Sequence, residues 1–392
     1  MSAATVLPTP EGPGRASRYA GAFGSMLRSR WVTHRPFFLA HALTFGCNSR
    51  CQTCGYWKNT PRMKEDLTTP EVYALLDEAY DAGMRGYYLF GGEPLIRHDI
   101  TDLVDYANRK GFLVTMNTNG SFLAAKAPRL RGLDFAFVSL DYPGPFHDTI
   151  RGRPGSFDEV MRGIDRLREE TSAGVTLVTT ISTLNRDAMR PMAELARRKG
   201  LTISFNSVEP TLDFGLTDSA NSPNLRLGLT PEELQEFYRT LLALKREGYP
   251  LMESEQVLED FVEGRPWQCK FPQMFVYVTP NKQIYTCNYR YGYDLKHGSF
   301  EEYFASPEYR SWAGEALACN RCIRTCVRGY SYTYDLKLAH LWSLASSSGS
   351  LFRSRPVPRP SESPAPSDRP GLPRAPGEAN PLGASLPRLR GQ

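Results

Sequence analysis

The sequence lacks the features of a membrane or secreted protein. It has no run of about 18 apolar residues, the length that a membrane-spanning helix requires. It does not open with a charged segment followed by a short apolar run, as a secretory signal would. Cysteine is scarce, with eight in 392 residues, whereas a disulfide scaffold is shorter and richer in cysteine. We therefore predict a cytoplasmic protein with free thiols and no transmembrane segment.

Basic charge is missing from the part of the chain where a nucleic-acid surface would need it. The whole chain carries a net charge of +5. Residues 1–35 hold five arginines against one acid, and residues 351–392 hold seven arginines against three acids, so each end carries +4. The body between the ends is left with −3. This distribution predicts that the protein has no nucleic-acid partner.

Both ends of the chain are predicted to lie outside the folded part. Residues 351–392 contain ten of the thirty prolines, with arginine, serine and glycine between them. Such a composition cannot bury a core, and it predicts a disordered Pro/Arg-rich tail. Residues 1–35 contain arginines and an Ala/Gly/Ser-rich middle, and we predict a flexible N-terminal lead-in. A transit peptide or a membrane-surface helix is the alternative there.

Helical segments alternate with short apolar strands through the body of the chain. A first strand is expected at 38–45. Helical segments are then expected at 69–83, 96–111, 130–134, 157–170 and 189–200. The strand after each of them is expected at 86–94, 112–120, 135–141, 174–182 and 201–210, in the same order. The strands are nearly continuous apolar runs, as in a parallel sheet buried on both faces. Six such units are too few for a closed eight-stranded barrel, so they predict an α/β fold with a partial (β/α)6 TIM-like barrel at 36–215. Residues 216–266 are expected to form a linking helical segment.

Three cysteines directly follow the first predicted strand. Cys47, Cys51 and Cys54 lie in "TFGCNSRCQTC", and residues that follow strand ends form the active-site edge of such a barrel. Zinc usually takes four ligands, and no fourth ligand stands nearby apart from His41 in the preceding strand. A [4Fe–4S] cluster can be held by three thiolates, which leaves one iron open to a further ligand. The spacing therefore favours a catalytic cluster, with a zinc knuckle as the alternative.

Further motifs stand at the ends of the later strands. They are "GGEP" (Gly91, Gly92, Glu93, Pro94), "NTNG" from Asn117, "SLD" with Ser139 and Asp141, and "HDTIRG" at 147–152. Alone, each would be no more than a tight turn or a helix cap. In their order behind the cysteine triplet, however, they resemble the radical S-adenosylmethionine (SAM) superfamily. The resemblance covers residues 36 to about 210.

The resemblance implies where SAM would bind. Gly91 and Gly92 would let the backbone approach the methionyl amine closely, and Glu93 would add an acceptor. Tyr56 would lie against the adenine. The implied SAM-binding set also includes Pro94, Asn117, Ser139 and Asp141.

A second group of cysteines follows the barrel and comprises Cys269, Cys287, Cys319, Cys322 and Cys326. Between the first two, "VYVTPNKQIYTC" predicts a β-hairpin that turns at Pro280 and Asn281. A hairpin flanked by two cysteines, with a distant Cys-x2-Cys, resembles the twitch module, a shortened relative of the SPASM extension that adds auxiliary clusters. The resemblance implies an auxiliary [4Fe–4S] cluster in a module at 267–340, with Cys326 as the spare thiol. A structural zinc site is the alternative.

The resemblance also implies a reaction. SAM would bind the open iron through its amine and carboxylate, and an electron supplied by a reductant such as flavodoxin or ferredoxin would cleave the sulfonium C–S bond. Methionine and a 5′-deoxyadenosyl radical would form, and the radical would take hydrogen from a substrate C–H bond. The sequence identifies no catalytic side chain beyond the cofactor-binding residues.

The substrate class is predicted less directly. Only 46 residues precede Cys47, which is short for a built-in domain that binds a leader peptide. We therefore expect a tailoring or biosynthetic enzyme that oxidises or rearranges a small molecule or a lipid. A ribosomal-peptide maturase of the SPASM type is the alternative, and a non-catalytic iron–sulfur electron carrier is a remote one.

Overall fold

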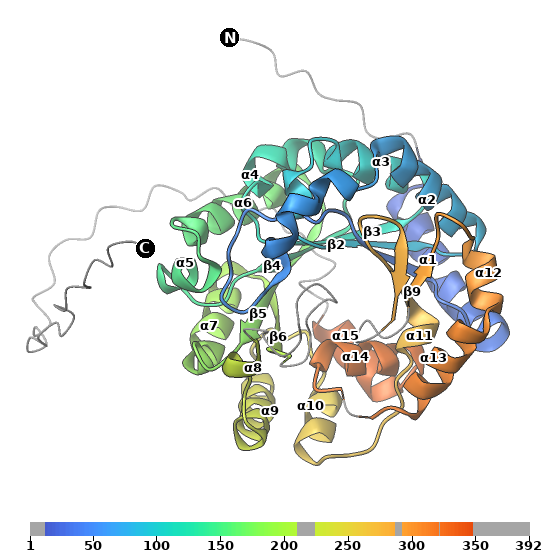
Figure 1. The fold of residues 1–392 in the computed structure, drawn as a ribbon. Helices are drawn as coiled ribbons and strands as arrows, with labels where there is room; N and C mark the ends of the chain where they lie inside the picture. Colours follow the sequence, from blue (N-terminus) through green and yellow to red (C-terminus); the bar gives the residue numbers. More distant parts are fainter. Residues whose placement is uncertain (1–11, 210–223, 287–291, 321, 348–392) are drawn as a thin grey trace, which may run out of the picture. The chain divides into compact units, whose positions relative to one another are not determined.

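A nine-stranded sheet forms the framework of the described part of the chain (Figure 1). This computed structural model describes residues 12–209, 224–286, 292–320 and 322–347. The strands are β1 (Phe38–Ala42), β2 (Gly86–Phe90), β3 (Leu113–Thr118), β4 (Phe135–Ser139), β5 (Gly174–Ile181), β6 (Thr202–Ser207), β7 (Phe275–Val278), β8 (Gln283–Tyr285) and β9 (Gly292–Asp294). Their order across the sheet is β6-β5-β4-β3-β2-β1-β7-β8-β9. Neighbouring strands from β6 to β7 are parallel.

Helices connect the strands along the outer face of the curved sheet (Figure 1). The barrel helices are α2 (Thr69–Asp81), α3 (Ile100–Lys110), α4 (Leu123–Lys126), α5 (Phe146–Arg151), α6 (Ser156–Glu170) and α7 (Met189–Lys199). The later helices are α8 (Asn224–Leu227), α9 (Pro231–Arg246), α10 (Glu255–Val262), α11 (Phe271–Met274), α12 (Phe300–Ala305), α13 (Pro307–Ala318), α14 (Thr325–Tyr334) and α15 (Leu338–Ser347). The alternation of β1–β6 with helices confirms the predicted partial barrel.

Local sequence signals explain where the main helices begin and end. Thr68 and Glu71 form a capping box at the start of α2, with proline in the first turn, and these groups satisfy backbone N–H groups that the helix itself leaves free. Thr230 and Glu233 do the same for α9. At the end of α3, Gly111 adopts a left-handed conformation with φ of 106°, which glycine accepts without strain. The ends of α2, α3, α6 and α7 agree with the predicted ends within two residues, whereas the helical segment predicted at 130–134 is wrong, because the helix of that unit is α4.

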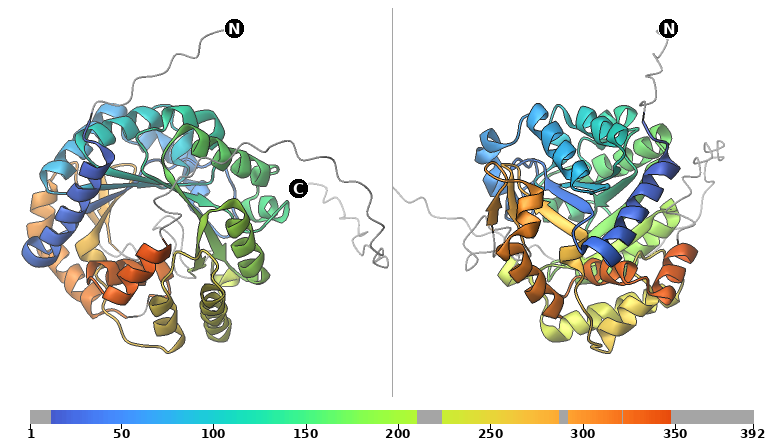
Figure 2. Two further views of the ribbon diagram at one scale, coloured as in Figure 1. Left: turned by 180° about the vertical axis from the view of Figure 1, so that it is seen from behind. Right: turned by 90° about the vertical axis from the view of Figure 1, so that its right-hand side faces the viewer.

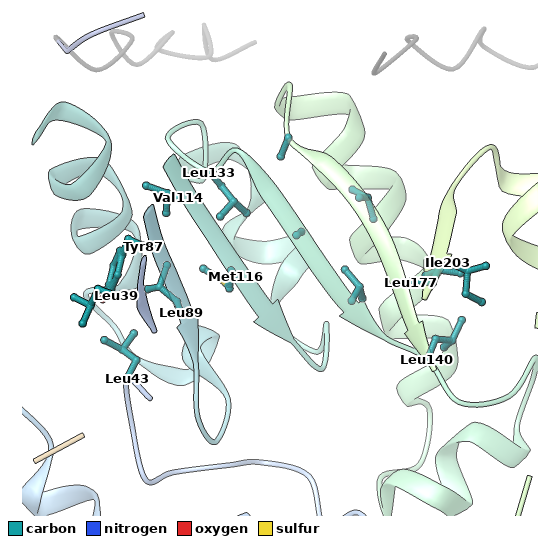
Figure 3. Close-up of a cluster of buried hydrophobic side chains, with 14 of the residues drawn as sticks. Leu39, Leu43, Tyr87, Leu89, Val114, Met116, Leu133, Leu140, Leu177 and Ile203 are labelled. Atoms are coloured by element: carbon teal, nitrogen blue, oxygen red, sulfur yellow. The ribbon is translucent and has the colours of Figure 1, made fainter. Parts of the chain in front are cut away.

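The strand register separates the two faces of the sheet. Leu39 lies beside Tyr87, and Tyr87 lies beside Val114; these side chains face the helices in the main hydrophobic core, as Figure 3 shows. Because side chains alternate along a strand, the intervening residues face the inner side of the sheet. There, Ala40 lies beside Tyr88. At the strand ends the inner face carries the polar residues Asn117 and Ser139.

The predicted hairpin forms, and it continues the barrel sheet. β7 and β8 are antiparallel, with Tyr277 beside Tyr285. β7 also pairs in parallel with β1, where Phe38 lies beside Phe275. The segment expected to open a separate module is thus hydrogen-bonded to the first barrel strand.

The prediction of a flexible lead-in at 1–35 is wrong for its second half. Residues Arg15–Arg28 form α1 and Ser29–Thr33 form a π-helical turn, η1 (Figure 2, dark blue). Arg18, Ala22 and Met26 recur every four residues and are buried, so they form one face of the helix. The Nη2 atom of Arg18 contacts Asp134 Oδ1 at 2.7 Å. Composition alone missed this helix because its anchor is a charge pair with a distant acid.

Two other predictions cannot be compared with the structure. The predicted tail at 351–392 and the first eleven residues lie outside the described residues. Within the part that the structure describes, no helix is long and apolar enough to cross a membrane.

The Arg18–Asp134 pair generates a first prediction. Both side chains are almost fully buried, and Asp134 also accepts a hydrogen bond from the Val114 backbone. Arg18→Met should lower the free energy of unfolding by about 3 kcal/mol, because it leaves a buried carboxylate that only Arg15, at 3.9 Å, still faces. Arg28→Met, on the exposed part of α1, is the control and should change stability by less than about 0.5 kcal/mol. Urea unfolding measures both, and equal effects would contradict the anchoring role of Arg18.

Candidate active site

The cysteine loop follows β1 and is fixed to neighbouring segments by hydrogen bonds. The backbone N–H groups of Arg50 and Gln52 donate to the carbonyl oxygens of Arg151 (3.1 Å) and Ile150 (2.9 Å) at the end of α5. Cys51 is buried, whereas Cys47 and Cys54 are partly exposed. The loop is therefore held in place by the protein itself.

A second set of bonds joins the loop to the end of β3. The Asn119 side-chain amide donates to Asn48 Oδ1 at 2.8 Å and to Ser49 Oγ at 3.1 Å. Asn48 in turn donates to Ser121 Oγ at 2.8 Å. The predicted "NTNG" motif thus supports the cysteine loop through Asn119.

The "GGEP" segment lies against the residues that precede Cys47. The backbone N–H groups of Gly92 and Glu93 donate to the carbonyl oxygens of Thr44 (3.0 Å) and Gly46 (2.8 Å). A Cβ atom on Gly92 would lie 1.8 Å from the Gly46 oxygen. No other residue fits at this position without moving the backbone, which explains the glycine.

Glu93 has a structural role that the sequence did not predict. It is fully buried. One carboxylate oxygen accepts from Leu95 N at 3.0 Å and Thr118 Oγ1 at 2.7 Å, and the other accepts from Asn119 N at 2.6 Å. Burial raises the pKa of Glu93, although these hydrogen bonds oppose the shift. The carboxylate therefore ties the "GGEP" segment to the end of β3, in addition to any contact with SAM.

The Arg151 guanidinium lies between the Asp141 carboxylate and the Cys51 thiol. Arg151 Nε lies 2.7 Å from Asp141 Oδ2, and Arg151 Nη1 donates to Cys51 Sγ at 3.8 Å. Asp141 also accepts from Thr180 N. The guanidinium thus brings positive charge to the cysteine loop and balances the Asp141 carboxylate. The sequence motif "HDTIRG" contains Arg151, but sequence reasoning gave this arginine no role.

Burial makes the cysteine thiols weak acids. It raises the pKa of Cys47 to about 12 and that of Cys54 to about 11, and it raises the pKa of Cys51 while Arg151 opposes the shift. A metal must therefore displace the thiol protons when it binds. Among the described residues, no three histidine, cysteine or acidic side chains converge on a point that one ion could occupy. Three thiols on one loop match the ligand number of a cluster with one open iron, whereas structural zinc takes four ligands.

The remaining predicted SAM-binding residues lie at the carboxyl ends of the strands. Asn117 is on the inner face beside Phe137, and its buried Oδ1 has no hydrogen-bond partner among the described residues. Ser139 is the last residue of β4 and is partly exposed. Pro94 is buried at the start of a 3-10 turn. His41, by contrast, lies beside Leu89 on the helix-facing side and contacts Tyr87, so it is directed away from the cysteine loop.

Tyr56 lines a pocket between the cysteine loop and the hairpin. The pocket is also lined by Ala42, Phe45, Arg62, Phe90, Tyr277, Val278, Thr279, Asn281 and Tyr285. The hairpin is attached directly here, because Leu67 N donates to Pro280 O at 2.8 Å. Five of the lining side chains are aromatic, so the pocket suits a planar or apolar group.

The later cysteines are only partly brought together. One packing cluster contains three of the later cysteines, Cys269, Cys322 and Cys326. Its other members include Phe271, Phe275 and Tyr330. Cys319 is partly exposed on the segment before α14. Cys287 lies outside the described residues. The structure therefore places four of the five predicted ligands, and three of those four share one packing cluster.

Glu253 is a buried acid that sequence reasoning did not identify. Of the six buried carboxylates among the described residues, Asp99, Asp134, Asp141 and Asp260 have ion pairs and Glu93 has hydrogen bonds on both oxygens. Glu253 accepts from Ser204 Oγ at 2.7 Å, but its Oε2 atom has no hydrogen-bond partner. Burial raises its pKa. Burial is the main cause of the raised pKa of Cys326. Arg324 opposes this shift, and the Glu253 carboxylate adds to it.

Comparison with known proteins agrees with these motifs. Residues 42–196 match the radical SAM superfamily. An AdoMet-dependent heme synthase of Methanosarcina barkeri is 32% identical over 173 residues, which cover 43% of this chain and 49% of that protein. A mycofactocin maturase of Mycobacterium tuberculosis is 31% identical over 45% of this chain and 46% of its own length. The chain thus spans about half the length of the curated relatives that it matches.

Solved structures resemble the fold at low sequence identity. Streptococcus suis SuiB bound to S-adenosylmethionine has a TM-score of 0.55 at 12% identity and covers 71% of this chain and 67% of its own. The protein anSMEcpe with bound AdoMet has a TM-score of 0.56 at 14% identity and covers 80% of this chain and 99% of its own. These similarities concern the fold alone.

The match of residues 42–196 to the radical SAM superfamily agrees with the resemblance that the motifs predicted. Proteins of this superfamily use a [4Fe–4S] cluster and SAM. The residues present fit both groups. Three thiols stand on a loop that hydrogen bonds hold in place, and Asn117 directs an unsatisfied oxygen to the inner face.

The contacts of Glu93 generate a second prediction. Glu93→Gln should lower the free energy of unfolding by about 2 kcal/mol. The glutamine NH2 group would replace one carboxylate oxygen, so at least one buried donor would lose its acceptor. Urea unfolding of the full chain measures the loss. If Glu93 acted on SAM alone, SAM affinity would fall while stability stayed unchanged.

A matched control is available on α2. Glu71 accepts from Thr68 in an exposed capping box, where glutamine serves equally well. Glu71→Gln should therefore leave both stability and SAM affinity unchanged.

Proposed function

We propose that this chain cleaves SAM reductively and uses the product radical to take hydrogen from a substrate C–H bond. Cys47, Cys51 and Cys54 would hold the cluster, whose fourth iron would bind SAM. The observation that carries the proposal is the attachment of the cysteine loop to the "GGEP" segment, the end of β3 and the end of α5. Three motifs that are distant in sequence meet at one loop, which an electron carrier would not need.

The chain's own residues prepare this site in three ways. Backbone hydrogen bonds fix the loop before the cluster binds, which lowers the entropy lost on binding. Arg151 offsets the negative charge that the thiolates and Asp141 bring into a buried site. Tyr56 and the hairpin wall exclude water from the inner face, which protects a reactive radical. When bound, the cluster and SAM supply the electron transfer and the 5′-deoxyadenosyl radical.

A low-potential one-electron donor is required for this reaction. Flavodoxin or ferredoxin would fill that role. Cleavage would yield methionine, and the radical would become 5′-deoxyadenosine when it takes a hydrogen atom from the substrate.

For the substrate, we favour a small molecule or a lipid that the enzyme oxidises or rearranges in a tailoring pathway. The support is the pocket beside Tyr56, where five of the ten lining side chains are aromatic, together with the similarity to heme synthases. A peptide maturase is the second candidate. It is supported by the similarity to the mycofactocin maturase and by the fold shared with SuiB, which has been solved bound to its precursor peptide SuiA.

We further propose an auxiliary [4Fe–4S] cluster held by Cys269, Cys287, Cys319 and Cys322. Cys269 and Cys322 contact the same packing cluster, next to a hairpin that is hydrogen-bonded to β1. Cys326 lies in α14 and packs on the same cluster, so its assignment as the spare thiol rests on the resemblance to the twitch module.

The cysteine triplet generates a third prediction. Replacing Cys47, Cys51 and Cys54 together by alanine should abolish 5′-deoxyadenosine formation by anaerobically reconstituted protein with SAM and dithionite. Iron should fall from about eight to about four per chain, because only the auxiliary cluster would remain. Wild-type protein with intact clusters and no SAM cleavage would support the carrier hypothesis instead. Loss of all iron in the variant would show that the two sites are not independent.

The auxiliary ligands generate a fourth prediction. Cys319→Ala and Cys322→Ala should each remove about half of the iron, since a site closed by four thiolates has no redundant ligand. Cys326→Ala is the matched control, because it changes a cysteine of the same segment, and it should keep about eight irons per chain. Iron analysis and electron paramagnetic resonance of the three variants measure this. Iron loss in Cys326→Ala with retention in Cys319→Ala would reverse the assignment.

A further inference from the structure

The inner face of the barrel strands is partly exposed, whereas their outer face is not. On the outer face, Leu89, Met116 and Leu177 are completely buried beneath the helices. On the inner face of the same sheet, side chains near the carboxyl ends of the strands are partly exposed. They are Tyr88 and Phe90 in β2, Asn117 in β3, Phe137 and Ser139 in β4, and Val178 and Thr180 in β5. The inner face therefore leaves room for solvent near the active-site edge.

One half of this inner face is aromatic. Tyr88 stacks on Phe90 with ring centroids 5.4 Å apart, and Phe137 meets Tyr88 edge to face at 6.4 Å. Phe90 also meets Tyr277 of β7 edge to face at 5.5 Å. We call Tyr88, Phe90, Phe137 and Tyr277 the aromatic wall. Because Phe90 and Tyr277 also line the pocket beside Tyr56, the wall continues from that pocket into the barrel and suits a planar group.

The other half of the inner face is polar. It belongs to the paired strands β5 and β6, where Thr176 lies beside Thr202 and Thr180 lies beside Asn206. Together with Ser204 of β6, we call these residues the polar wall. Their hydroxyl and amide groups are uncharged, so they can form hydrogen bonds with a ligand but cannot balance an ionic charge.

Glu253 brings a carboxyl group to the polar wall. Its Oε1 atom accepts from Ser204 Oγ at 2.7 Å and from Phe205 N at 3.1 Å, whereas its Oε2 atom has no hydrogen-bond partner. Lys245 acts on this carboxylate through its charge, and its Nζ atom donates to Leu251 O at 2.8 Å. A buried carboxylate oxygen without a partner is costly. The site therefore favours a ligand that brings a donor with a positive charge.

Helix α14 lies between the two walls on the open side of the barrel (Figure 1). Thr325 Oγ1 donates to Glu253 Oε1 at 3.3 Å. Tyr330 of the same helix contacts Phe275 of β7, with ring centroids 5.4 Å apart. Burial is the main cause of the raised pKa of Tyr330, and the ionised forms of Tyr88 and Glu253 add to it. Glu253 and the aromatic wall therefore border the same region of the inner face.

We propose that Glu253 binds a protonated amine of the substrate while the aromatic wall packs against a ring of the same molecule. The substrate is then a small aromatic amine. An amine supplies both the N–H donor and the positive charge that the free oxygen lacks, and aromatic rings attract cations as well. A carboxylate would add negative charge beside Glu253, and a purely apolar molecule would leave its oxygen unpaired. This inference rests on the proposed function for the role of the bound molecule as the substrate.

Binding of two matched probes to the anaerobically reconstituted full chain tests the proposal. The probes are 2-phenylethylamine and 2-phenylethanol, which share a ring and differ in the charged group. Isothermal titration calorimetry is done with SAM and without a reductant, so that no turnover is needed. The wild type should bind the amine at least about tenfold more tightly than the alcohol. Glu253→Gln should weaken amine binding at least about tenfold and leave alcohol binding unchanged.

Two further variants separate the contributions of charge and ring. Phe137→Leu should weaken the binding of both probes by the same factor, because both lose a ring contact. Glu236→Gln is the matched control, since it makes the same change at a side chain that is 69% exposed on α9, and it should bind both probes as the wild type does. Iron content and circular dichroism show whether each variant folds.

Several outcomes would overturn the proposal. They are absence of amine binding, equal binding of amine and alcohol by the wild type, and unchanged amine binding by folded Glu253→Gln. The comparison of the two probes on the wild type needs no variant. Formation of 5′-deoxyadenosine is measured separately. A wild type that binds the amine through Glu253 but cleaves no SAM would contradict the proposed function and retain the amine site.

Discussion

The candidate active site depends on one constraint: a loop with three thiols must keep its shape before any metal binds. Backbone and side-chain hydrogen bonds from three strand or helix ends meet this requirement, through Gly92, Asn119 and Arg151. A free loop of this length would lose conformational entropy on every binding event. The bonds that fix it also bring the motifs that we predict to bind SAM to the same edge of the sheet.

The second requirement is charge balance in a buried site. Four of the buried carboxylates described here are paired with arginine, and Glu93 distributes its charge over backbone donors. Arg151 contacts both Asp141 and Cys51, so it links the "SLD" motif to the cysteine loop. Glu253 is the exception among the described residues, because its Oε2 atom has no hydrogen-bond partner and burial raises its pKa.

The sheet also connects the two cysteine groups. β7 pairs with β1, so the hairpin of the auxiliary segment is hydrogen-bonded to the strand that leads into the cysteine triplet. The pocket beside Tyr56 is lined from both sides of this junction. Any group bound there contacts the barrel and the hairpin together, which makes the hairpin a wall of the site and a determinant of what the site accepts.

The sequence by itself determined the features that depend on neighbouring residues. Strand and helix order follow from local periodicity, the helix starts from capping boxes, the β7–β8 turn from Pro280 and Asn281, and the chemistry of the loop from the spacing of Cys47, Cys51 and Cys54. Those features were predicted correctly or, for the ligands, stand as proposals. Only the tertiary structure decided the rest. Arg18 meets an acid 116 residues away, Glu93 accepts hydrogen bonds from Thr118 and Asn119, His41 faces the helices, and β7 pairs with β1. Each of these depends on which distant group desolvates or pairs with a side chain, and no local pattern carries that information.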